Sequence, residues 1–302
     1  MSEEGEVVRE ELVSVVIPTM GRRSLEKAVQ SALSQTHPRI QVVVVNDSDT
    51  DVEVAPDPRV RLLSTPHPRS GGSAARQIGI AAAEGGLIAL LDDDDFWEPS
   101  FLEEVLSEAG GSKEKTWWIG SAIGRLEDGS VFPSRAYSPQ ESVLEYIFTL
   151  RGGSFTKGAV PTSSMVFPKA LGEFHPWRES VKYHQDLDWL ADVCRERPDI
   201  KLFQSSSKLV NYGDTPGSVV KKISPSMSLA WAHRLLELPQ GRRLFAHFLL
   251  SRQPFRAAAS SGKMKDVLTV VIEAERHGHP NVTVRLWALT YFLRSVFRRP
   301  RA

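Results

Sequence analysis

The sequence has one cysteine, no excess of either charge and no long hydrophobic run. Because Cys194 has no second cysteine to pair with, an internal disulfide is excluded, and the composition suits a reducing cytoplasm. No uncharged apolar stretch reaches the roughly 18 residues that span a bilayer. Residues 1–6 are acidic and lack the apolar segment of a signal peptide. We therefore expect a cytoplasmic protein.

The zero net charge hides an asymmetry along the chain. Of the 37 basic and 37 acidic residues, 15 basic and 4 acidic ones lie from Pro216 onward, which leaves 22 and 33 before it. The 302 residues can bury one large core with a smaller appendage. We expect an acidic first part, residues 1–222, and a basic second part, residues 223–302.

Short β-branched runs alternate with helix-like segments over the first hundred residues. Strands are predicted at residues 13–17, 41–45, 60–63 and 87–91, and helices at 24–33 and 72–84. This alternation predicts an α/β fold with a mainly parallel sheet that is covered on both faces. Polar clusters at residues 18–19, 46–49 and 92–95 each follow a strand, so they should meet at one edge of the sheet.

Four consecutive aspartates, residues 92–95 (the acidic tetrad), directly follow the apolar run at 87–91. Four adjacent carboxylates repel one another unless positive charge lies among them. Asp92 and Asp94 share one side of an extended segment, where together they can hold a hard divalent cation beside a phosphate-bearing substrate. A solvated acidic turn or a structural Ca²⁺ loop is the alternative.

Four motifs, in this order and spacing, resemble the successive signatures of family 2 glycosyltransferases. They are residues 14–19 (SVVIPT), 44–51 (VVNDSDTD), 71–79 (GGSAARQIG) and 91–95 (LDDDD) followed by Pro99. The resemblance covers residues 12–218. It implies a GT-A, Rossmann-like domain that binds a nucleotide sugar, in residues 1–222, and usually inversion at the anomeric carbon.

The resemblance also implies donor-binding roles. Pro18 and Thr19 would line the site of the base and ribose. Asp47 would accept a hydrogen bond from a base N–H such as uracil N3, which favours UDP or dTDP donors; Asn46 departs from the family's first acid. Arg76 would offset the diphosphate, or serve as a structural counter-ion of the tetrad.

Within the tetrad, Asp94 matches the last acid of the family's Asp-X-Asp motif. We expect it to bind Mn²⁺ or Mg²⁺ directly. Asp92 would bind the ribose or reach the metal, and Asp95 would orient the loop. Asp93 is grouped with the donor-binding residues, although of the four it is the one expected to be incidental.

The catalytic base is expected at the start of a helix that runs from residue 185 to about 197. Asp186 matches the acid of the family's Glu-Asp pair, with Gln185 in place of the glutamate. His184 is the rival base on intrinsic pKa grounds, and Asp186 can also serve as a helix N-cap. Trp177 would stack on an acceptor sugar or pack in the core.

Two family features are missing. Many relatives carry a histidine near Thr215, and here Lys221 and Lys222 would supply the positive charge when a lid closes over the donor. The Gln-X-X-Arg-Trp motif of processive synthases is absent, which favours transfer of one sugar per encounter.

Beyond residue 223 the sequence predicts helices at 226–238, 241–250, 263–277 and 282–298. The last is basic, aromatic and amphipathic. It is typical of a peripheral contact with the inner face of a membrane, of a dimer contact, or of packing on the catalytic domain. Nucleic acid is not expected as a partner, since no binding motif accompanies the charge.

The sequence therefore predicts a metal-dependent, inverting glycosyltransferase that moves one sugar from a nucleotide-diphosphate sugar to a hydroxyl acceptor. A nucleotidyltransferase of related α/β fold is an alternative that would release pyrophosphate. A non-catalytic nucleotide-sugar-binding protein is another. The donor sugar and the acceptor depend on the shape of the site, which motifs do not encode.

Overall fold

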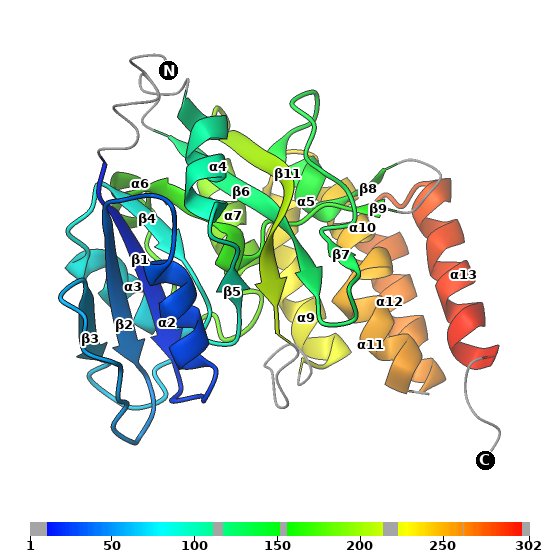
Figure 1. Ribbon diagram of the computed structural model, residues 1–302. Coiled ribbons are helices and arrows are strands. Elements are labelled where there is room, and N and C mark those ends of the chain that lie inside the picture. The colour runs from blue at the N-terminus through cyan, green and yellow to red at the C-terminus, as the bar shows by residue number, and fades with distance from the viewer. Residues whose placement is uncertain (1–10, 111–116, 152–155, 214–222, 262, 298–302) are drawn as a thin grey trace. The chain divides into compact units, whose positions relative to one another are not determined.

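The computed structural model describes residues 11–110, 117–151, 156–213, 223–261 and 263–297 (Figure 1). The chain divides into two compact units, one from residues 1–139 and 160–216 and the other from residues 140–159 and 217–302. The sequence placed residues 140–159 with the first part. They belong to the second unit because their apolar side chains pack there; the ring of Phe148, for example, lies 6.0 Å from that of Phe248.

The first unit is built on a nine-stranded sheet with the order β3-β2-β1-β4-β10-β6-β11-β5, and β7 pairs with β6. The strands are β1 (Val13–Thr19), β2 (Ile40–Asn46), β3 (Val60–Ser64), β4 (Leu87–Leu90), β5 (Phe96–Trp97), β6 (Trp118–Leu126), β7 (Val131–Phe132), β10 (Val166–Pro168) and β11 (Lys201–Tyr212). All four strands that the sequence predicted are present.

Pairing in this sheet is mixed and mainly parallel, as predicted. β1 pairs in parallel with both β2 and β4, and β2 with β3. β10 then runs antiparallel to β4 and β6. Because β1, β2 and β4 are parallel, the loops after Thr19, Asn46 and Leu90 leave the same edge of the sheet.

Helices cover both faces of the parallel strands, which explains why β2 is apolar along most of its length (Figure 1). Val42 and Val44 pack in one cluster with Leu25 and Val29 of α2 (Leu25–Leu33). Their neighbours on β2 point the other way and pack with Ala75 of α3 (Gly72–Ala82). The remaining helices of this unit are α4 (Phe101–Ala109), η2 (Thr162–Ser164), α6 (Lys169–Phe174) and α7 (Gln185–Glu196).

The described part of the second unit is helical, with a short antiparallel pair of strands. Its elements are α5 (Val143–Phe148), β8 (Leu150–Arg151), β9 (Thr156–Lys157), α9 (Pro225–Ala232), η3 (His233–Glu237), α10 (Gly241–Ser251), α11 (Gln253–Ser261), α12 (Met264–His277) and α13 (Val282–Phe297). The predicted C-terminal helices are present, while α11 was not predicted. No helix among the described residues is both long and apolar enough to cross a membrane.

Candidate active site

The acidic tetrad forms a tight turn directly after β4. The Asp95 N–H donates to the Asp92 carbonyl at 3.1 Å. Ser163, on η2, closes the turn from the other side: its hydroxyl accepts from the Asp92 N–H at 3.0 Å and donates to Asp95 Oδ2 at 2.5 Å. The Gly213 N–H, just after β11, donates to Asp95 Oδ1 at 2.9 Å. Asp95 therefore orients the loop, as the sequence predicted.

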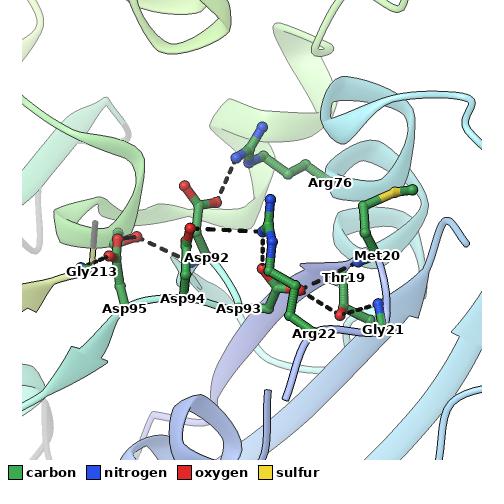
Figure 2. Close-up of polar contacts among 11 residues, drawn as sticks. Thr19, Met20, Gly21, Arg22, Arg76, Asp92, Asp93, Asp94, Asp95 and Gly213 are labelled. Carbon is green, nitrogen blue, oxygen red and sulfur yellow. Dashed lines mark hydrogen bonds and ion pairs between the residues drawn. The ribbon is translucent and has the colours of Figure 1, made fainter. Parts of the chain in front are cut away.

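Two arginines supply the positive charge that four adjacent carboxylates require. Arg76 Nη2 lies 2.5 Å from Asp92 Oδ1. Arg22 donates to Asp93, and its Nη1 lies 3.8 Å from Asp94 Oδ2 (Figure 2). Sequence reasoning found Arg76 but missed Arg22. The available signal was its position three residues after Thr19, at the same edge of the sheet.

Asp93 is the most buried member of the tetrad, with 1% of its side chain exposed. Its Oδ2 accepts from the Thr19 hydroxyl at 2.5 Å and from the Met20 N–H at 3.3 Å, while Oδ1 accepts from Arg22 (Figure 2). These bonds tie the loop after β4 to the loop after β1. The donor-binding roles expected of Thr19 and Asp93 stay predictions, since their side chains are engaged with each other.

Asp47 is similarly buried and holds the loop that leads to α3. It accepts from the Thr65 hydroxyl at 2.9 Å, the Ser70 N–H at 2.7 Å and the Gly71 N–H at 2.8 Å. Gly71 has a φ of +105°, a conformation that side chains strongly disfavour. A carboxylate has about four acceptor positions, so about one remains for a nucleobase. Pro18, the next-to-last residue of β1, is partly exposed.

Arg76 joins the tetrad to the start of α7. Its Nη1 donates to Gln185 Oε1 at 2.8 Å while Nη2 contacts Asp92. A Cβ at position 72 would lie 2.9 Å from both Arg76 Nη1 and Gln185 Oε1, so Gly72 leaves room for this pair. Arg76 Nε is a buried donor for which the described residues offer no acceptor.

The ring of Trp177 packs against the Arg76 guanidinium and is too buried to contact an acceptor sugar. The Arg76 guanidinium carbon lies 5.1 Å from the centre of the Trp177 ring. Trp177 is 3% exposed and stacks on Trp189, with 5.2 Å between ring centres. The proposed stacking of Trp177 on an acceptor sugar is therefore wrong, and its packing role is confirmed.

Asp186 is the second residue of α7, and the charges of Arg76 and Asp92 both act on it. Burial raises the pKa of Asp186 above 3.8, and Asp92 raises it further, while the Leu187 N–H and Arg76 act in the opposite direction. The N-cap of α7 is His184, which has a left-handed backbone, so Asp186 is not the N-cap. Burial lowers the pKa of His184 to about 4, which makes its ring a weak base.

The two partly exposed carboxylates of the tetrad fit a divalent metal bound together with substrate. Asp92 is 32% exposed and Asp94 is 18% exposed, whereas burial and the nearby Asp92 raise the pKa of Asp95 to about 8. The described residues contain no group of three or more His, Cys, Asp or Glu side chains arranged around a metal position. Mg²⁺ is usually bound by one or two carboxylates plus substrate phosphates and water, so the donor set of Asp94 and Asp92 is compatible with it.

Part of the expected site lies outside the described residues. This applies to Lys221 and Lys222 and to the segment around Thr215.

The family model described as glycosyl transferase family 2 matches residues 14–146. Residues 14–146 therefore carry the family 2 glycosyltransferase domain. Over 235 residues it is 27% identical to the amylovoran biosynthesis glycosyltransferase AmsB of Erwinia amylovora, covering 72% of this chain and 75% of that protein. It is 41% identical over 91 residues to the succinoglycan biosynthesis protein ExoO of Rhizobium meliloti, covering 28% of this chain but only 26% of ExoO.

Solved structures show that the chain has the GT-A fold. Residues 1–349 of S. aureus TarS, in complex with UDP, match with a TM-score of 0.58 at 15% identity, over 94% of this chain and 88% of that one. The mannosyltransferase PcManGT from Pyrobaculum calidifontis, in complex with GDP-Man and Mn²⁺, matches with a TM-score of 0.53 at 13% identity, over 95% and 86%.

Proposed function

We propose that this family 2 glycosyltransferase transfers a single sugar, with inversion, from a nucleotide-diphosphate sugar to a hydroxyl acceptor. Asp186 is the base, and Asp94 with Asp92 holds Mn²⁺ or Mg²⁺. The observation that carries the proposal is the double contact of Arg76, with Asp92 on one side and Gln185 on the other. It connects the tetrad to the helix start that bears Asp186, although 91 residues separate Asp95 and Asp186 in sequence.

Charge development in the reaction explains these positions. As the sugar–phosphate bond lengthens, positive charge grows on the sugar ring and negative charge on the leaving diphosphate. The Arg76 guanidinium, which lies beside Asp92, places positive charge close to that developing negative charge. When bound, a divalent metal supplies Lewis-acid stabilisation of the same oxygens.

Asp186 accepts the proton of the acceptor hydroxyl. A general base works best when its pKa is close to the working pH, and burial moves the pKa of Asp186 in that direction. His184, with a pKa of about 4, holds a proton poorly at neutral pH. Asp186 is therefore proposed as the base in preference to His184.

The donor is proposed to carry uracil or thymine, through Asp47. TarS has been solved with UDP and with UDP-GlcNAc, whereas PcManGT has been solved with GDP-Man. Both kinds of base thus occur on this fold. The acceptor position of Asp47 that remains after its three internal donors suits the N3–H of uracil or thymine.

The first test is thermal stabilisation by UDP, dTDP, GDP and CDP, each with Mn²⁺, with Mg²⁺ and with EDTA. We expect one diphosphate to raise the melting temperature only with metal, and Asp94→Asn to abolish the effect. Asp128→Asn is the matched control, because Asp128 is an exposed acid in the turn between β6 and β7, outside the residues assigned to the donor or the metal. Stabilisation that persists in EDTA or in Asp94→Asn would refute the metal assignment.

The second test uses Asp186→Asn with the donor identified in the first. The variant should bind donor and metal as the wild type does but transfer no sugar, and the released product should be a nucleoside diphosphate. Release of pyrophosphate would instead establish nucleotidyl transfer. Donor binding by the wild type without turnover over a broad acceptor screen would favour a binding protein.

A further inference from the structure

The second unit displays an apolar face on its last two helices. Its members are side chains between 45% and 67% exposed, namely Met264, Leu268 and Ile272 on α12 and Val282, Leu286, Leu289, Leu293 and Val296 on α13. We call these eight residues the apolar face. Soluble proteins seldom leave so many neighbouring large apolar side chains in water unless the surface binds something.

Helix geometry places the α13 members in one stripe. They follow a spacing of four, three, four and three residues, which at about 100° per residue keeps them on one side of the helix. The opposite side supplies the packing contacts, since Val284 and Ala288 are buried. The outer stripe is therefore not needed to hold α13 in the unit.

An ion pair joins the α12 stripe to the α13 stripe. Glu275 lies on the same side of α12 as Met264 and Leu268 by the same helix geometry. Its carboxylate accepts two hydrogen bonds from Arg285, at 2.7 and 2.6 Å, and Arg285 flanks the α13 stripe. The two stripes thus adjoin and form one surface.

The net charge around the apolar face is positive. Lys265 and Arg276 are exposed and border the α12 stripe, and the exposed Arg294 lies on the flank of α13 away from Arg285. The acids Asp266 and Glu273 project from the opposite side of α12. Among the described residues of α12 and α13, Glu275 is the exposed acid, and it is already paired with Arg285.

We propose that the apolar face docks on an anionic membrane surface, with its leucine and valine side chains in the headgroup boundary and its cations on lipid phosphates. An apolar stripe bordered by Lys and Arg is the pattern of helices that lie in the plane of a membrane. A second copy of the chain fits less well. It would bring a cationic border against a cationic border, with no exposed acid on α12 or α13 left to pair with it.

The inference goes beyond the proposed function and is tested without measuring sugar transfer. The wild-type protein is floated with vesicles of phosphatidylcholine alone and of phosphatidylcholine with phosphatidylglycerol. It should bind the second kind, and rising salt should weaken binding. Leu289→Asp and Leu293→Asp should each reduce binding about tenfold, and Arg294→Gln about fivefold on the anionic vesicles only.

The matched control is Leu62→Asp, which alters an exposed leucine on β3, 41% exposed, and should bind as the wild type does. Absence of wild-type binding, equal binding to both vesicle types, or unchanged binding by Leu289→Asp would each overturn the proposal. So would a wild-type dimer, seen by light scattering without vesicles, that Leu289→Asp dissociates, because the face would then be an interface between copies. Arg294→Gln and the salt series keep the test decisive if an aspartate variant fails to fold.

Discussion

Asp93 and Asp94 are adjacent in sequence, but replacing Asp93 with asparagine should mainly lower stability, whereas replacing Asp94 should mainly abolish metal-dependent binding. Asp93 is 1% exposed and accepts from Thr19, Met20 and Arg22. Asparagine keeps one acceptor oxygen and places an NH₂ group against N–H or O–H donors. The lost charge-assisted bond costs about 1.5–3 kcal/mol, and a donor left unsatisfied about 1–3 kcal/mol more.

Because Arg22 is 33% exposed, solvent screening reduces the cost of losing its charge-assisted hydrogen bond to Asp93. We expect Asp93→Asn to lower the free energy of unfolding by about 3 kcal/mol, which corresponds to a fall of roughly 6–12 °C in melting temperature. Asp94 is 18% exposed and 3.8 Å from Arg22, and its charge is repelled by its neighbours. Asp94→Asn should change stability by less than about 1 kcal/mol while abolishing metal-dependent nucleotide binding.

Urea and thermal unfolding followed by circular dichroism measure both variants, with Arg22→Gln and Arg22→Gln/Asp93→Asn completing a double-mutant cycle. The double variant should be clearly less destabilised than the sum of the single ones. If Asp93→Asn is as stable as Asp94→Asn, the structural role assigned to Asp93 is refuted. Strict additivity in the cycle would show that Arg22 and Asp93 do not act as a pair.

Three further predictions concern Arg76, Asp186 and pH. Gly72→Ala should lower kcat/KM about ten- to a hundredfold with little loss of stability, because the new Cβ would lie 2.9 Å from Arg76 Nη1 and Gln185 Oε1 and would displace these side chains. Gly86→Ala is the control: its Cβ would meet nothing within 4 Å, so kcat/KM should not change. In a pH–rate profile, kcat/KM should fall as the pH decreases and Asp186 becomes protonated. Because the pKa of Asp186 is raised, this acid limb should lie above pH 3.8. An acid limb at or below pH 3.8 would contradict the assignment of Asp186 as the base. Because the pKa of Asp186 is higher in the folded than in the unfolded protein, ionised Asp186 lowers stability at neutral pH. Asp186→Asn should therefore raise the melting temperature at neutral pH. The gain should vanish below about pH 4, where Asp186 is protonated in both the folded and the unfolded protein.

The order of elements over the first hundred residues and the position of the tetrad were predictable from the sequence. The parallel strands follow from periodic β-branched runs, and the tetrad follows from an apolar strand that ends at acids. These are local patterns, because the alternation of apolar and polar side chains over a few consecutive residues is enough to indicate a strand or a helix. The family resemblance rests on the same contiguous motifs.

Relations between distant segments were not predictable in this way. The sequence marked Asp93 as the acid expected to be incidental, yet tertiary packing makes it the anchor between two loops, 74 residues from Thr19. Arg22 carries no motif of its own, and only the approach of the β1 and β4 loops brings it to the tetrad. Trp177 looked equally suited to a sugar or to the core until its stacking on Trp189 was seen.

The sequence by itself therefore determined the fold class, the family and the acids that deserve testing, because short-range periodicity and motif order encode them. Only the tertiary structure decided which acids hold loops and which face solvent. It also decided which arginine joins the tetrad to α7, and that the stripes of α12 and α13 adjoin. Burial and charge pairing depend on what the fold places beside a residue, and a linear pattern does not contain that information.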